Sequence, residues 1–150
     1  MALNIRIVDP KQVRTQKGQL RIYAFDKAVY ATEFSGHLED RHVDLFLSYS
    51  EERIRLASGK LTVFHDWLEM TGYDSSCRKR ITDWTVKHLS AYAVVHVALR
   101  SKLVAMGVQV ANIALGGLVK THQTRISLEA AIVAAVATEI APRSVRPTRP

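Results

Sequence analysis

Alternating apolar and polar residues predict three short strands in the first part of the chain. The first is expected at 4–8, where N-I-R-I-V alternates before Pro10, and the others at 20–25 and 28–34. Asp26-Lys27 is the expected two-residue turn between the second and third strands. The chain therefore begins as an antiparallel meander.

A helical period replaces the alternation after Ser35-Gly36, which is expected to break the third strand. Apolar residues recur at helical spacing over 39–57, and charged residues fill the other face. A short buried strand is then predicted at 60–65 and a loop at 67–73. Asp74-Ser75 has the residue types that begin a helix.

The second half of the chain continues to alternate between strands and helices. Strands are predicted at 93–99 and 118–122, a helix at 102–115, and an Ala-rich helix that Ser127 caps. The order is thus βββαβαβαβα. This order predicts an α/β fold, in which a mixed sheet is packed against about four helices.

Length and composition indicate one packed domain of 150 residues, 47% of them hydrophobic. We assign it to 1–141 and interpret 142–150 as a disordered basic tail of Pro and Arg. The single cysteine excludes a disulfide framework and fits a reducing compartment. No apolar run is long enough to span a membrane, and charges interrupt the start of the chain, so a cytoplasmic protein is expected.

The net charge of +7 does not by itself indicate nucleic-acid binding. Part of it lies in the tail, and the run Arg78-Lys79-Arg80 is flanked by Asp74 and Asp83. Aromatic residues are not interleaved with the basic ones, as a stacking surface for single strands requires. We therefore expect no nucleic-acid partner.

One segment, LTVFHDWLEMTGYDSSCRKRITDW at 61–84, resembles the centre of a STAS domain. In that family a hydrophobic strand ends in an acidic residue, and Asp-Ser-Ser or Asp-Ser-Thr followed by Gly begins a helix. Here Asp66 and Asp74-Ser75-Ser76 take these places, while Cys77 replaces the glycine and the intervening loop is longer. The order of elements over roughly 29–136 is similar to the divergent SpoIIAA-like branch.

The resemblance implies a regulatory, protein-binding function of the anti-sigma-factor-antagonist type. Its phosphoacceptor would be Ser76, with Ser75 as the alternative, and its partner a kinase or an anti-sigma factor. A phosphate at a helix start would meet free backbone N–H groups and the nearby Arg78 and Lys79. The simpler interpretation is that Asp74 and the serines only cap the helix.

The expected loop adds apolar residues beside this motif. Trp67, Met70 and Tyr73 could form a docking surface together with Asp66 and with Asp74, Arg78 and Lys79, or could fold onto the sheet as ordinary core. Both interpretations stay open from the sequence.

Two other function classes compete with protein binding. An intracellular small-molecule or lipid-binding module would use a cavity between helix and sheet near Phe64, Trp67 and Trp84. An enzyme or metal site would use His65 and Asp66 with His96, although neighbouring residues of a strand point to opposite faces. We expect no enzyme, cofactor or metal, and interpret His96 as a core histidine.

Two further features have alternative interpretations. Cys77 is either a small buried residue or a reactive thiol in the first turn of a helix. The helix at 102–115 is apolar nearly all round, so it is either deeply buried or part of a self-association face. A homodimer through this helix, the terminal Ala-rich helix, or both is therefore a hypothesis.

Overall fold

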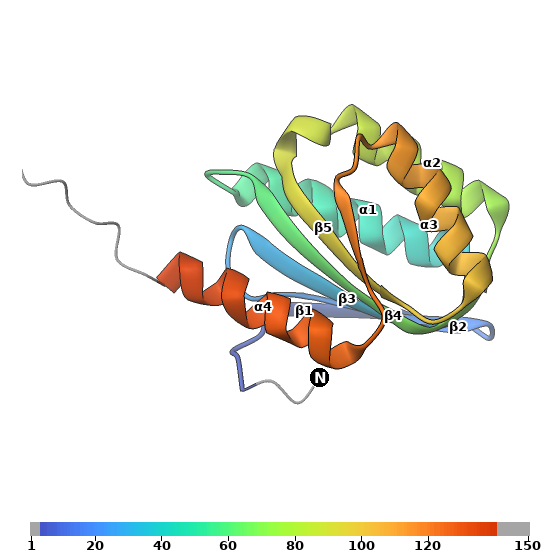
Figure 1. Ribbon diagram of the computed structural model, residues 1–150, viewed down its shortest axis with the longest axis horizontal. Helices are drawn as coiled ribbons and strands as arrows, with labels where there is room; N and C mark the ends of the chain where they lie inside the picture. Colours follow the sequence, from blue (N-terminus) through green and yellow to red (C-terminus); the bar gives the residue numbers. More distant parts are fainter. Residues whose placement is uncertain (1–3, 141–150) are drawn as a thin grey trace, which may run out of the picture.

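A computed structural model describes residues 4–140 and contains one six-stranded sheet in the order β1-β2-β3-β4-β5-β6 (Figure 1). Strands β1 to β3 pair antiparallel, and β3 to β6 pair parallel. This order of elements confirms the predicted alternation. The elements are β1 Val8–Arg14, β2 Gly18–Ala24, β3 Val29–Leu38, α1 Asp40–Leu56, β4 Leu61–Tyr73, α2 Ser75–Lys87, β5 Tyr92–Leu99, α3 Lys102–Ala114, β6 Val119–His122 and α4 Arg125–Ile140.

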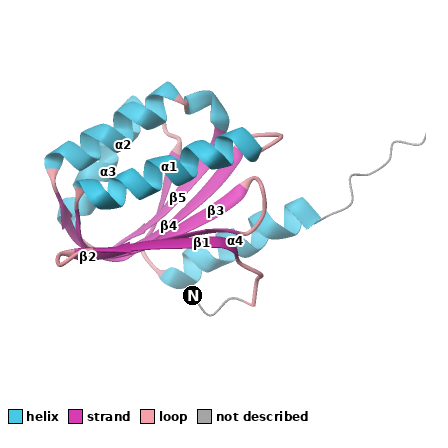
Figure 2. Cartoon of the chain, turned by 180° about the vertical axis from the view of Figure 1, so that it is seen from behind, coloured by secondary structure: helices cyan, strands magenta, loops and turns pink. Residues whose placement is uncertain are grey.

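The connections explain how the helices are distributed over the sheet. Helices α1, α2 and α3 each join two adjacent parallel strands, and such crossovers are almost always right-handed. Since every crossover steps in the same direction along the sheet, all three helices lie on one face (Figures 1 and 2). Helix α4 follows the last strand and covers the opposite face.

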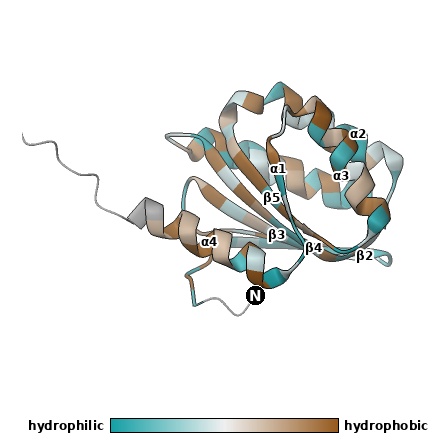
Figure 3. Cartoon of the chain, in the orientation of Figure 1, coloured by the Kyte–Doolittle hydropathy of each residue, from teal (hydrophilic) through white to brown (hydrophobic). Residues whose placement is uncertain are grey.

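Two hydrophobic cores result, one on each side of the sheet. The larger lies beneath α1–α3 and includes Tyr30, Val63 and Val97. The smaller lies against α4 and joins Phe64 to Ile132. Figure 3 shows hydrophobic residues along the strands that these helices cover.

Strand β4 is far longer than predicted, because it includes the segment at 67–73 that was expected to be a loop. Its pairing with β3 slips between Asp66 and Glu69, where β4 contains one extra residue. Such a bulge reverses the alternation of side chains. Phe64 and Leu68 therefore face α4, whereas Met70 joins the core on the other side.

The first strand was also misplaced. It runs over Val8–Arg14 and contains Pro10, which was expected to end it. An edge strand tolerates proline, and the pairing of β1 with β2 is irregular between Val8 and Lys11.

Two expected boundaries differ as well. Strand β3 continues through Gly36 to Leu38 instead of ending at Ser35-Gly36, because Gly36 has a φ of 91° that a glycine adopts without strain. Helix α4 begins two residues before Ser127, and Thr124 Oγ1 accepts the backbone N–H of Ser127 at 3.1 Å. Thr124 thus provides the cap that was assigned to Ser127.

The predicted tail at 142–150 lies outside the described residues. Among the residues that the structure describes, no helix is long and apolar enough to cross a membrane.

Candidate functional site

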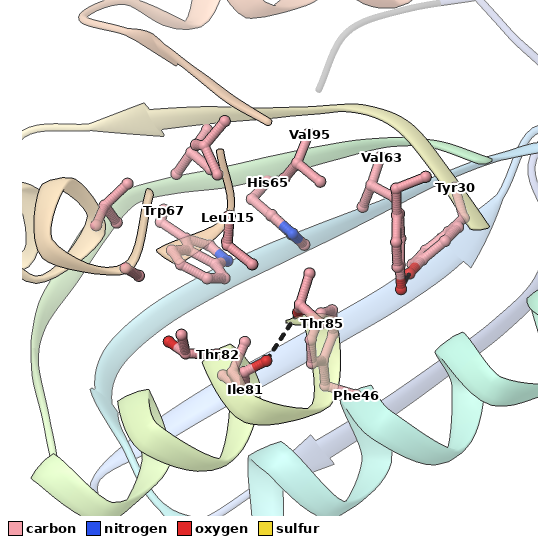
Figure 4. A pocket seen from close by; sticks show the side chains of 15 residues that line it. Tyr30, Phe46, Val63, His65, Trp67, Ile81, Thr82, Thr85, Val95 and Leu115 are labelled. Carbon is pink, nitrogen blue, oxygen red and sulfur yellow. Dashed lines mark hydrogen bonds between the residues drawn. The ribbon is translucent and has the colours of Figure 1, made fainter. Parts of the chain in front are cut away.

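An apolar cavity of about 80 Å³ lies between the sheet and the helices α1, α2 and α3 (Figure 4). Tyr30, Val63 and His65 form part of its floor, and Ile81 of α2 and Val108 of α3 are among the residues that close it. The threonines of α2 that line the cavity direct their hydroxyl groups away from it. Thr85, for example, donates to the carbonyl oxygen of Ile81 at 2.7 Å, so its methyl group remains for the cavity.

A second apolar cavity of about 70 Å³ adjoins the first toward the end of β4. Five side chains line both spaces and so form the wall between them. They are Trp67, Ile81, Thr82, Val108 and Ala111. The two spaces therefore share one wall.

His65 is the principal polar group on the floor of the first cavity. Its Nδ1 lies 2.6 Å from Thr32 Oγ1, which also accepts the indole N–H of Trp67 at 3.0 Å. The Trp67 ring stacks on the His65 ring with centroids 4.6 Å apart, and the Phe46 ring contacts the His65 ring in an edge-to-face arrangement. Burial lowers the pKa of His65 to about 3, so the imidazole is neutral at pH 7.

The hydrogen bonds also indicate where the proton of this imidazole lies. Thr32 Oγ1 accepts from Trp67, and its own hydrogen can be donated to His65 Nδ1. His65 then carries its hydrogen on Nε2, the nitrogen that does not contact Thr32. Figure 4 shows the ring extending into the cavity from the sheet, so the site offers one neutral donor in apolar surroundings.

Tyrosine hydroxyls form a second polar group on the same cavity wall. Tyr30 donates to Ser50 Oγ at 2.8 Å, and the Tyr92 hydroxyl lies 3.4 Å from that of Tyr30. Burial raises the pKa of Tyr92 to about 12, so this hydroxyl is neutral. Both tyrosines line the cavity, which therefore carries no net charge.

The predicted switch lies at the start of α2, outside this cavity. Ser75 and Ser76 are exposed, and they line a shallow hollow with Arg78 and Lys79. Asp74 precedes the helix but makes no capping hydrogen bond with its side chain. Its carboxylate instead lies 2.8 Å from His37 Nε2, and this hydrogen bond lowers the pKa of Asp74.

Nearby cations of α2 already have carboxylate neighbours. Lys79 pairs with Asp83 at 2.5 Å. Arg80 contacts Asp40 and Asp44 of α1 at 2.8 and 2.7 Å. A phosphate on Ser76 would have to compete with these ion pairs for Lys79 or Arg80, whereas Arg78, which lines the same hollow, belongs to neither.

The remaining residues of the predicted docking surface are elsewhere, because they belong to β4. Trp67 forms a cavity wall, Met70 is buried, and Tyr73 packs beneath Gly107 of α3. Asp66 faces α4, where Arg125 Nε donates to its Oδ2 at 2.8 Å. The structure thus brings together only Asp74, Ser75, Ser76, Arg78 and Lys79.

The alternative cavity was predicted at nearly the right place but with an incorrect lining. Trp67 does line it, whereas Phe64 faces α4 and Trp84 packs against His88 beside the cavity. Thr32 and the cavity-facing residues of α3 were not singled out. A hydrophobic pattern shows that such residues are buried but does not show that a space remains between them.

The proposed acid–base or metal cluster does not assemble. His65 faces the cavity, while His96 and Asp66 lie on the α4 face, as the strand geometry requires. Within 4–140 no group of three or more His, Cys, Asp and Glu side chains is placed to hold a metal.

Cys77 fits the structural interpretation rather than the reactive one. It is fully buried, with Sγ 3.7 Å from the carbonyl oxygen of Leu38. Burial raises the pKa of the thiol to about 11, so little thiolate forms at neutral pH.

Comparison with solved structures identifies the class of fold. An uncharacterized protein of the DUF3478 family from Shewanella loihica PV-4, described as having a SpoIIAA-like fold, matches with a TM-score of 0.56. The alignment covers 87% of this chain and 97% of that chain at 15% identity. The chain therefore has a SpoIIAA-like fold, as its sequence suggested. No family model and no curated protein matches the sequence.

Proposed function

We propose that this protein binds a small, largely apolar molecule in the cavity beneath α2 and α3. The observation that carries the proposal is an apolar space with a neutral imidazole on its floor. An empty space in a packed interior lowers stability, because its lining loses van der Waals contacts. Ligand pockets typically combine such walls with a few polar groups that orient the ligand.

The size of the space limits the ligand. An engineered apolar cavity of about 150 Å³ binds benzene. The two cavities, at about 80 and 70 Å³, approach that size when joined, which is well below the roughly 300 Å³ of a drug-sized site. A single ring or short chain with one hydrogen-bond acceptor for His65 fits, whereas a complete lipid tail requires α3 to move.

Thermal unfolding in the presence of small ring compounds tests this proposal. Anisole, cyclohexanone and acetophenone, each a single ring with one acceptor, supplied at about ten times Kd, would stabilise the fold by about 1.4 kcal/mol. For a chain of this size that corresponds to a rise in Tm of roughly 3–6 °C.

Matched variants of α3 provide the control. Ala111→Leu adds a side chain into both cavities, so the ligand-dependent rise in Tm should disappear. Ala114→Leu places the same side chain on an exposed position of the same helix and should leave the rise intact. A wild-type protein that no compound in the panel stabilises would contradict the proposal.

A protein-binding switch at the start of α2 is the second candidate function. Its support is the exposure of Ser75 and Ser76 in the first turn, where backbone N–H groups and the helix dipole favour a phosphate. Pull-down from the native host with wild type, Ser76→Ala and Ser76→Asp tests it. We expect Ser76→Ala to retain a protein that Ser76→Asp loses, and native protein to carry a phosphoryl group of about 80 Da. If all three proteins capture the same partners and the native protein carries no adduct, Ser76 is only a residue of the helix start and not a switch.

A further inference from the structure

Three side chains from three different elements form a continuous hydrogen-bonded chain on the α4 side of the sheet. His96 Nδ1 of β5 lies 2.9 Å from His122 Nε2 of β6. His122 Nδ1 lies 2.6 Å from the hydroxyl oxygen of Ser127 in α4. Both nitrogens of His122 are therefore engaged, one with a hydroxyl and the other with a second imidazole.

The geometry of the two rings favours proton transfer over metal chelation. Their centroids are 5.1 Å apart and the facing nitrogens 2.9 Å apart, so these nitrogens point at each other nearly along the line of centres. Two histidines that shared a metal would instead direct both lone pairs at a third point. His96 is also held in place, because its ring stacks on Phe64 at 4.8 Å with an interplanar angle of 10°.

Burial keeps this pair of imidazoles neutral. The pKa of His96 is lowered to about 4, mainly by burial and further by His122 and Lys120. Burial also lowers the pKa of His122. At pH 7 each ring therefore has one N–H and one lone pair, as a directional chain of hydrogen bonds requires.

Ser127 has an accessible hydroxyl that does not cap the helix. Thr124 accepts the backbone N–H of Ser127, so the Ser127 side chain is left to contact His122. Ser127 is exposed and lies in the first turn of α4.

We propose that Ser127, His122 and His96 form a nucleophilic site that hydrolyses small esters. Ser127 Oγ attacks the ester carbonyl carbon, and its proton passes to His122 Nδ1. The bond from carbon to the leaving oxygen then breaks, and that oxygen takes the proton from His122. Water attacks the acyl-serine in the same way and releases the acid. His96 is a positioning residue that accepts the Nε2–H of His122 and fixes its ring.

The site is independent of the apolar cavity, because the sheet separates them.

Labelling with a fluorophosphonate, followed by peptide mass analysis, tests the proposal on the full chain. The P–F bond breaks, an Oγ–P bond forms, and the proton leaves through His122. We expect labelling at Ser127 in wild type and at least about 10²-fold slower labelling in His122→Gln, which removes the general base. Wild type should likewise release p-nitrophenol from p-nitrophenyl acetate at least about 10²-fold faster than His122→Gln.

Two comparisons test whether labelling depends on the hydrogen bonds that join Ser127, His122 and His96. Ser76 is also exposed in the first turn of a helix but has no histidine bonded to it, so it should remain unlabelled. His96→Asn retains an acceptor for His122 and should keep most of the labelling rate, whereas His96→Leu should not. Far-ultraviolet circular dichroism confirms that each variant is folded. An unlabelled Ser127 in folded wild type, or equal labelling of Ser127 in His122→Gln, would overturn the proposal.

Discussion

The hydroxyl of Tyr73, at the end of β4, lies against Gly107 of α3 and occupies the place that a Cβ at 107 would take. Such a Cβ would also be 2.8 Å from Tyr73 Cζ, closer than real Cβ contacts come. The absence of a side chain at 107 is therefore what lets α3 approach the sheet at this point. This contact sets the distance between the sheet and α3, the helix that closes the cavity.

Gly107→Ala should displace α3, because its methyl group collides with the Tyr73 ring. Overpacking of this kind costs about 1–3 kcal/mol, which outweighs the better helix propensity of alanine. Urea unfolding measures the effect. Tyr73→Phe in the same chain removes the hydroxyl and should restore part of the loss, whereas additive effects would contradict the contact.

His65 should make the fold less stable as the pH falls. Its folded pKa of about 3 is below the unfolded value of 6.5, so below pH 6.5 the unfolded chain takes up a proton that the folded chain does not. Between pH 6.5 and 3 this histidine lowers the free energy of unfolding by up to about 1.4 kcal/mol per pH unit.

Urea unfolding at pH 7, 6 and 5 isolates this contribution. His65→Asn keeps an acceptor for Thr32 but does not titrate, so its stability should fall less steeply than that of wild type. Equal slopes for wild type and His65→Asn would show that His65 is accessible to protons in the folded state.

Asp66 and Arg125 should be energetically coupled. The Asp66 side chain is 7% exposed and accepts from Arg125, so Arg125→Ala leaves a buried carboxylate without its cation. We expect a loss of about 1–3 kcal/mol. Asp66→Asn should lessen the cost of removing Arg125 in a double-mutant cycle. Arg100→Ala breaks an exposed ion pair with Glu69 and should cost roughly 0–1 kcal/mol.

Helix α3 should mediate self-association through its outer face. Leu103, Met106, Val110 and Ile113 are 57%, 64%, 55% and 83% exposed. Their spacing of three, four and three residues is the seam of a coiled coil. We expect a dimer at micromolar concentration in light scattering, and a monomer for Met106→Glu with Val110→Glu. A monomeric wild type would remove the homodimer hypothesis.

The sequence predicted the fold well because each element has a strong hydrophobic period. The order of strands and helices was correct, and most boundaries of α1, α3 and β5 lie within one or two residues of the prediction. Errors arose where the period was interrupted. The bulge after Asp66 made the end of β4 look like a loop, and the irregular pairing near Pro10 concealed β1.

The candidate sites were much less predictable than the fold. His96, His122 and Ser127 come together only because three elements meet at one end of the sheet, and nothing in their spacing indicates it. The cavity depends on side chains from α1, α2, α3 and the sheet failing to fill a common volume. By contrast, Ser75 and Ser76 could be placed from the sequence, because a helix start is a local feature.

His65 and Asp66 are neighbours in β4, yet the His65 side chain lines the cavity and the Asp66 side chain faces α4. Substitutions can therefore alter either face while leaving the other intact, so the two surfaces are free to diverge separately. An insertion or deletion of one residue before this pair has the opposite effect, because it exchanges the faces of both side chains at once. Changes in the length of β4 should consequently be far rarer than changes in its residues.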